Sequence, residues 1–174
     1  MTMVRVLLVV SFLVLVACDE NAKSNERDET VKSQDLTKIN AKAIESLNYT
    51  DYALSEDAET IVNPWEKYQE LTIQINYLKK GDLSFFNGDK ALLVDFIKEF
   101  KDNIPESLQT RPISSRVTLL ETFILKLNDD LTLSNIKVED KLESIKAVLE
   151  SFSNLNFQIN KKLERDLFDS IKPE

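Results

Sequence analysis

The chain contains few side chains that can carry out acid–base, nucleophilic or metal chemistry. Its 174 residues include one cysteine, Cys18, and no histidine. Because imidazole is absent, the Ser-His-Asp and Cys-His arrangements of nucleophilic catalysis cannot form. Zinc sites that use cysteine or histidine are excluded too, and a single cysteine makes no intrachain disulfide. The composition still allows carboxylate chemistry and an oxygen-ligand site for Ca²⁺ or Mg²⁺.

The carboxylates form no recognisable catalytic or metal-binding pattern. The pair Asp129-Asp130 lacks the spaced oxygen ligands and the turn glycine of a calcium loop. No other pair of acidic residues stands out from the ordinary surface of the predicted helices. We therefore expect a protein that is not an enzyme and that holds no metal and no cofactor.

Glu121 is the acidic residue with the strongest claim to a special environment. It lies between Val117 and Ile124 on the inward side of its predicted helix. A buried carboxylate there needs a cationic or hydrogen-bonding partner. One interpretation is a ligand-binding or proton-transfer group. The other, which we favour, is a boundary residue paired with a lysine or arginine of a neighbouring helix.

Asn156 interrupts the apolar seam of the last predicted helix, with Asn154 and Asn160 nearby. A single asparagine in such a seam often fixes the register or the number of associating helices. One interpretation is therefore a homodimer formed through this helix. The other, which the ambiguity of heptad patterns favours, is a solvated helix edge.

The first 18 residues have the layout of an export signal. Arg5 supplies a positive charge, residues 6–16 form an almost uninterrupted apolar run, and Ala17-Cys18 follows. The run is too short to span a bilayer as a helix, which takes roughly 20 apolar residues. Its end, Leu15-Val16-Ala17-Cys18, resembles the lipobox of bacterial lipoproteins.

That resemblance implies a signal peptide over residues 1–17 and a lipidated Cys18. In the family, diacylglycerol is attached to the cysteine sulfur, the chain is cut before the cysteine, and the new amino group is usually acylated. One acyl chain binds a membrane only marginally, whereas two or three hold firmly. Residues 18–34 are rich in charge and poor in apolar side chains, which predicts a disordered tether.

The residues after Cys18 and the net charge bear on location and partners. In enterobacterial lipoproteins an aspartate at the position of Asp19 resembles an inner-membrane retention signal, whereas in Bacteroidetes lipoproteins acidic residues there resemble a surface-export signal. The Asn-, Lys- and Ile-rich composition favours the second group, so we expect the protein in the cell envelope, at the outer membrane in preference to the inner membrane.

The net charge is −8, and loss of Arg5 with the signal makes it −9. Such a surface argues against nucleic-acid binding and against attachment to anionic lipids by charge.

Apolar residues recur at helical spacing through residues 35–174, and glycine and proline are scarce. The pattern predicts an all-α domain: an antiparallel up-down bundle of four main helices, with a minor helix before them. The main helices are predicted at 64–80, 89–103, 112–131 and 136–171, and the minor one at 35–47. Because 136–171 contains no glycine or proline, we favour one long helix over two helices broken near 151–154.

Local signals set several of these boundaries. Asn63 is predicted as an N-cap with Pro64 at the first helical position, and Gly81 as a left-handed cap at the other end of that helix. The acidic run 55–59 is expected to add another turn or two before it. Phe85-Phe86 is expected to close one end of the bundle. The apolar residues of the helix at 89–103 are expected to face inward: Leu92, Leu93, Phe96, Ile97 and Phe100.

In size and layout the domain resembles helical domains of uncharacterised Bacteroidetes envelope lipoproteins, a resemblance that brings no active site with it. We expect a non-enzymatic protein-binding or scaffolding domain that engages an envelope protein through its outer face or its long helix. The alternative is a small-ligand sensor or carrier with a cavity between helices. Trp65 with Tyr68, or the Phe85-Phe86 pair, would then line the cavity, although aromatic residues at helical spacing are more often plain core.

Overall fold

A computed structural model of the chain describes residues 39–171. The chain divides into two compact units, Met1–Asp35 and Leu36–Glu174, and the second contains all of the described residues. The predictions for the signal peptide (1–17), for Cys18 and for the tether (18–34) lie outside the described residues.

The predicted all-α class is confirmed for residues 39–171, which contain no β-strand. The four longest helices lie within two residues of their predicted ranges, and the last of them is one continuous helix, as favoured above. In chain order the elements are α3 (Ala41–Glu45), α4 (Glu56–Val62), α5 (Glu66–Lys79), α6 (Lys90–Asp102), the 3-10 helix η1 (Glu106–Leu108), α7 (Arg111–Thr132) and α8 (Val138–Ile171).

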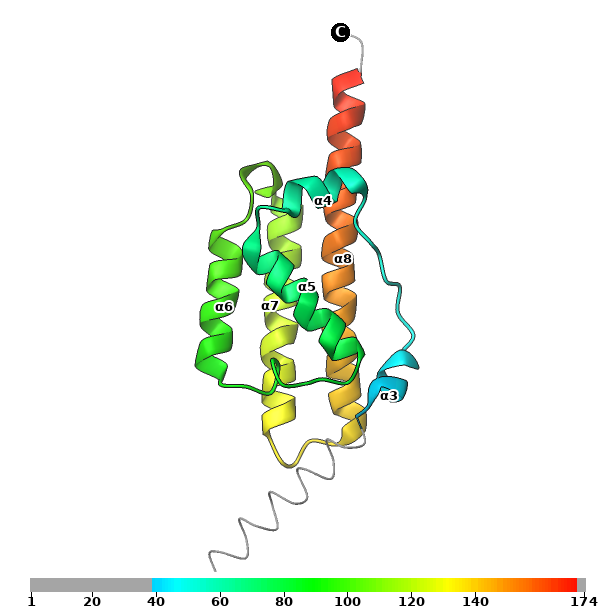
Figure 1. The fold of residues 1–174 in the computed structure, drawn as a ribbon, viewed down its shortest axis with the longest axis vertical. Helices are drawn as coiled ribbons and strands as arrows, with labels where there is room; N and C mark the ends of the chain where they lie inside the picture. The colour runs from blue at the N-terminus through cyan, green and yellow to red at the C-terminus, as the bar shows by residue number, and fades with distance from the viewer. Residues whose placement is uncertain (1–38, 172–174) are drawn as a thin grey trace, which may run out of the picture. The chain divides into compact units, whose positions relative to one another are not determined.

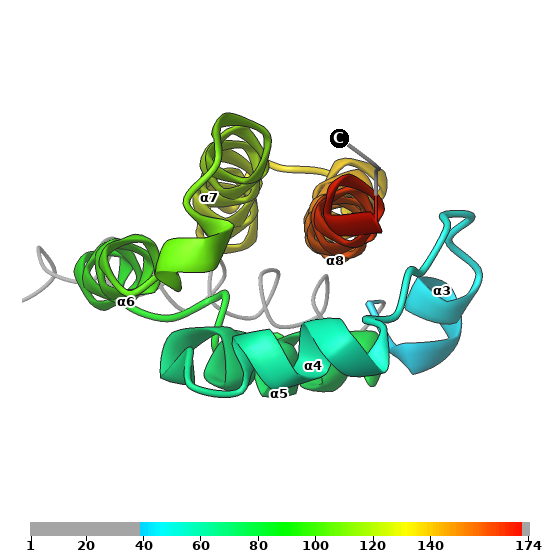
Figure 2. The same cartoon turned by 90° about the horizontal axis from the view of Figure 1, so that it is seen from above.

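The helices form a packed bundle in which α7 and α8 make the most extensive contact. A short connection, residues 133–137, joins these two helices, which lie side by side (Figure 1). Viewed from above, α7 and α8 form one layer, α4 and α5 form a second, and α6 lies at the edge beside α7 (Figure 2). The C-terminal end of α8 runs past the other helices (Figure 1). There Leu167, Phe168 and Ile171 are largely exposed.

The core is filled by the apolar stripes of α5 to α8. Trp65 and Phe86 are fully buried within it, and the indole Nε1 of Trp65 donates to the carbonyl oxygen of Phe100 at 2.9 Å. Where α5, α6 and α7 meet, the remaining space is about 10 Å³. This is barely enough for one water molecule, so the core is closely packed where these three helices meet.

The predicted start of α5 is wrong. Asn63 has helical backbone angles and is the C-cap of α4 rather than the N-cap of α5, which begins at Glu66 after Trp65. The acidic run before it does form a helix, α4, because the Ser55 hydroxyl accepts a hydrogen bond from the Ala58 amide and caps it. Residues 63–65 therefore join the end of α4 to the start of α5, where the sequence had suggested only the start of one helix.

The end of α5 follows the prediction. Gly81 has a positive φ of 86°, the left-handed conformation that glycine adopts without steric cost. A Cβ atom at this position would lie 2.9 Å from the backbone nitrogen of Ala41. The glycine is therefore needed both for the turn and for the close approach of the segment that begins α3.

Two further predictions need correction. The minor helix predicted at 35–47 is shorter within the described residues, where α3 covers Ala41–Glu45. Leu92 does not face inward: 69% of it is exposed, whereas Leu93 and Phe96 on the same helix are buried. The stripe of α6 is already complete without Leu92, so this leucine falls on the outer side of the helix.

No helix within residues 39–171 combines the length and the apolar character needed to cross a bilayer.

Candidate functional sites

We consider two recesses on the surface of the described domain. The first, which we call the polar cleft, has a volume of about 460 Å³, in the range of small-molecule pockets. It lies between the segment 51–54 and the helices α4, α5 and α8. Its lining comprises Asp51, Tyr52, Ala53, Leu54, Glu59, Val62, Asn63, Tyr68, Gln69, Thr72, Ile75, Asn76, Lys79, Phe152 and Asn156.

A ladder of polar side chains on α8 holds the segment 50–55, which together with Asn156 contributes one wall of the polar cleft. Ser153, Asn156 and Asn160 are spaced so that they share one face of the helix. They bind the backbone of the extended segment 50–55, which belongs to no helix and would otherwise leave its amides and carbonyls unsatisfied. The hydrogen bonds run from Tyr52 N to Ser153 Oγ (2.7 Å), Ser153 Oγ to Thr50 O (2.7 Å), Asn156 Nδ2 to Tyr52 O (3.0 Å), Asn160 Nδ2 to Ala53 O (2.8 Å) and Ser55 N to Asn160 Oδ1 (3.0 Å).

Tyr68 connects this ladder to α5. Its hydroxyl donates to Asn156 Oδ1 at 2.6 Å, and the ring packs against Trp65 and Phe152. Burial raises the pKa of the Tyr68 hydroxyl well above its ordinary range. The hydroxyl therefore stays protonated and serves as a hydrogen-bond donor within the wall.

The second recess, which we call the acidic groove, lies on α6 and the adjoining part of α5. Its volume is about 520 Å³. Four carboxylates and one ammonium group surround an apolar floor. The lining residues are Lys67, Glu70, Phe85, Gly88, Asp89, Leu92, Leu93, Asp95, Phe96 and Glu99.

The acidic groove already holds one cation, Lys67 of α5. Its Nζ lies 2.8 Å from Glu70 Oε2 and 3.3 Å from Glu99 Oε2, and 5.0 Å from the centre of the Phe96 ring. The hydrogen bond to Glu70 is the main cause that raises the pKa of Lys67. Lys67 is thus held charged between two carboxylates and over an aromatic face.

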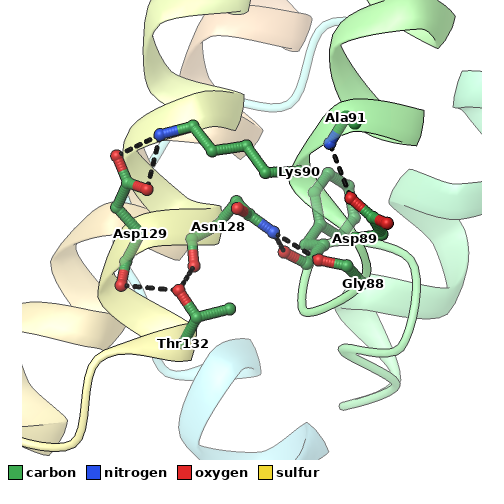
Figure 3. A network of polar contacts seen from close by, with 8 residues as sticks. Gly88, Asp89, Lys90, Ala91, Asn128, Asp129 and Thr132 are labelled. Carbon is green, nitrogen blue, oxygen red and sulfur yellow. Dashed lines mark hydrogen bonds and ion pairs between the residues drawn. The ribbon is translucent and has the colours of Figure 1, made fainter.

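Asn128 fixes the loop that forms one end of the acidic groove. It is buried in α7, and its Nδ2 donates to the carbonyl oxygens of Phe86 at 2.9 Å and Gly88 at 3.0 Å (Figure 3). Asp89 follows in the loop and caps α6 by accepting from the Ala91 amide at 2.8 Å. These contacts hold the start of α6 in place against α7, so this end of the groove is fixed.

The structure places the two polar residues selected from the sequence in different settings. Glu121 is at the edge of the bundle, and its Oε2 lies 2.8 Å from Nζ of Lys101 on α6. Asn156 is buried and bonds Tyr68 and the backbone of Tyr52 within its own chain, so it does not lie at a solvated helix edge. The two residues do not share a site.

A third polar cluster lies between α7 and α8. Ser144 Oγ accepts from Nζ of Lys126 at 2.7 Å and donates to the carboxylate of Asp130. A serine between a lysine and an aspartate has the residue types of a nucleophile with its base. However, Ser144 is only 2% exposed, and its hydroxyl proton is directed to a carboxylate inside the helix interface. We assign this cluster to holding α7 and α8 together.

The sequence suggested a pocket at Tyr68 or at Phe85-Phe86, and these residues do reach the two recesses, Tyr68 in the polar cleft and Phe85 in the acidic groove. The polar and charged residues that give each recess its character were not predicted. A signal for the acidic groove was present: Leu92 is an apolar residue outside a complete inward stripe, and acidic residues lie on both sides of it in Asp89 and Asp95. The partners of the α8 ladder had no such signal, because the segment 50–55 has no periodicity and lies about a hundred residues away in the chain.

Comparison of the chain with protein-family models, with curated proteins and with solved structures found no match. The geometry of the described residues is therefore the basis for the functional argument.

Proposed function

We propose that the chain is a lipid-anchored envelope lipoprotein whose helical domain binds a protein partner and is not an enzyme. The anchor would be the acylated Cys18, with residues 1–17 removed and residues 18–34 as the tether. Above that anchor, the four longer helices would form an up-down antiparallel bundle. The membrane proposal is supported by the lipobox-like Leu15-Val16-Ala17-Cys18, and outer-membrane placement is part of it.

The observation that carries the protein-binding proposal is the acidic groove and its exposed Leu92. Leu92, with 69% of its surface exposed, and the partly exposed Phe85 line the groove and present apolar surface to solvent. Such surfaces with a polar rim are typical of protein-binding sites. The fixed loop at one end of the groove lowers the entropic cost of binding.

A photo-crosslinking experiment in the source cells tests this proposal. A photoreactive amino acid in place of Leu92 is expected to form a discrete adduct with an envelope protein. Leu133, which is also half exposed but lies at the end of α7, is the matched control position and should give no adduct of that size. Absence of an adduct from position 92, or equal adducts from both positions, would contradict the proposal.

Mass spectrometry of the protein isolated from the same cells tests the anchor separately. The expected amino-terminal peptide begins at Cys18 and carries acyl chains. A chain that still contains residues 1–17, or an unmodified Cys18, would contradict the lipoprotein assignment while leaving the groove to be judged on its own.

A second candidate function, a small-ligand sensor or carrier, is favoured by the polar cleft. Asn63 and Asn76 are exposed along its rim, where their amides can both donate and accept hydrogen bonds. A ligand there would be small, polar and close to neutral. Native mass spectrometry of the protein purified without added ligand is expected to find a bound metabolite. Asn76→Trp fills the cleft and should lose the metabolite. Retention of the same bound metabolite by wild type and by this variant would contradict this function.

A further inference from the structure

The charge of the acidic groove restricts the chemistry of a protein partner. Glu70, Asp89, Asp95 and Glu99 carry four negative charges, and Lys67 carries one positive charge, so the lining has a net charge of −3. Lys67 is shared between Glu70 and Glu99. Asp95 has no ion-pair partner among residues 39–171. The groove therefore keeps negative charge that a partner can neutralise.

The floor of the acidic groove requires an apolar group from the same partner. Phe85, which is partly exposed, packs edge to face against the buried Phe96 with the ring centres 5.1 Å apart. Leu92 also lines the groove, with most of its surface in water. Covering this floor removes apolar area from solvent, at a gain of roughly 25 cal/mol per Å². A partner that carries charge alone would leave that gain unused.

The way Lys67 is bound indicates which cations suit the groove. The ammonium group is held by carboxylates and an aromatic face, the arrangement that also recognises lysine and arginine side chains in complexes. A metal ion fits less well, since residues 39–171 contain no group of three acidic side chains placed to coordinate one. The negative lining likewise repels phosphate groups and anionic lipids.

We propose that the acidic groove binds a basic amphipathic segment of a protein, with lysine or arginine on both sides of one bulky apolar side chain. The apolar side chain lies on Leu92 and Phe85, and the cations lie against Asp95 and the outer oxygens of Glu99. This inference rests on the proposed protein-binding function and names the chemistry of its partner. The acidic net charge of the whole chain steers such a segment toward the surface.

Binding of synthetic peptides to the purified full-length protein tests the inference. The probes are an amphipathic peptide of lysine and leucine, its counterpart with glutamate in place of lysine, and spermidine, which is cationic but has no apolar side chain. Fluorescence anisotropy is expected to show binding of the lysine peptide that weakens with added salt. Binding of the glutamate peptide is expected to be absent, and spermidine should compete poorly.

Matched variants locate the binding. Asp95→Lys is expected to raise the Kd for the lysine peptide about tenfold, and Leu92→Ser is expected to raise it as well. The controls are Glu143→Lys, the same charge change on an exposed residue of α8, and Leu133→Ser, the same apolar change at the end of α7. Both controls should bind like wild type. Asp95→Asn is a milder variant at the same position. Unfolding of both variants, followed by circular dichroism, shows whether Asp95→Lys has a folding defect.

Several results would overturn the inference. Equal weakening by Glu143→Lys and Asp95→Lys would mean attraction by net charge alone, without the groove. No binding of the lysine peptide, or equal binding of the glutamate peptide, would rule out a basic partner. A crosslinked partner at position 92 that contains no basic amphipathic segment would keep the proposed protein-binding function and reject this inference alone.

Discussion

The polar cleft and the acidic groove have similar volumes, about 460 and 520 Å³, but they use their polar groups in opposite ways. The deep polar side chains of the cleft, Tyr68 and Asn156, are bonded to each other, and Asn156 also bonds the backbone of Tyr52. The groove instead presents carboxylates around exposed apolar surface. A polar group that is satisfied within the chain supports the fold, whereas a charge left open beside an apolar floor is available to a partner.

The largest expected change in the free energy of unfolding comes from substitutions in the wall of the polar cleft. Asn156→Leu leaves the Tyr68 hydroxyl and the Tyr52 carbonyl without partners, and each buried unsatisfied group costs about 1 to 3 kcal/mol. We expect the free energy of unfolding in urea to fall by about 3 kcal/mol. Asn76→Leu, on the exposed rim of the same cleft, is the control and should change it by less than about 0.5 kcal/mol. Equal effects of the two substitutions would mean that the ladder does not support the fold.

A smaller effect, which depends on pH, is expected at Tyr68. Because burial raises the pKa of Tyr68 in the folded state, its contribution to stability is full below the unfolded-state pKa of about 10 and is lost as the pH rises above it. Tyr68→Phe should cost about 1 kcal/mol at neutral pH and make the decline above pH 10 shallower. Tyr49, whose pKa burial also raises, keeps part of the decline in the variant.

Urea unfolding at pH 8 and at pH 10.5 measures both effects. Tyr77→Phe, which removes a tyrosine from an exposed position on α5, controls for the number of tyrosines. A Tyr68→Phe protein that loses stability with pH as steeply as wild type would contradict the link between the buried hydroxyl and the decline.

The smallest change in the free energy of unfolding is expected from substitutions in the acidic groove, because its ion pairs are open to solvent. Glu99→Gln removes one of the two carboxylates around Lys67, but Glu70 remains at 2.8 Å. Exposed pairs contribute about 0.2 to 1 kcal/mol and are screened by salt. We expect a loss of less than about 0.5 kcal/mol at low salt and none in 1 M salt, measured by urea unfolding. A loss as large as that of Asn156→Leu would mean that the groove is part of the structural framework.

The sequence was sufficient to predict what depends on apolar periodicity. The stripes of α5, α7 and α8 recur at helical spacing, so the all-α class and the main helices could be predicted within two residues. The single helix α8 followed from the absence of glycine and proline between 136 and 171. Gly81 was identified because a left-handed cap after a helix strongly prefers glycine.

The sequence was insufficient where a contact joins distant segments. Asn156 was recognised as a polar interruption, but its partner Tyr52 is 104 residues away in a segment without any pattern. Asn63 resembles an N-cap by residue type, yet it ends α4, because capping signals do not distinguish the end of one helix from the start of the next when the two are adjacent. The acidic groove combines Lys67 of α5 with Glu99 of α6, a pairing that only the packing of the two helices creates.

The most direct test of the account is an NMR titration of the ¹⁵N-labelled full-length protein with the lysine and leucine peptide. The backbone amide signals of Leu92, Asp95 and Phe96 are expected to move with the added peptide, while those of Asn63 and Asn76 at the polar cleft stay in place. Shifts centred on Asn63 and Asn76, or shifts spread evenly over all acidic surfaces, would contradict the assignment of the acidic groove as the binding site.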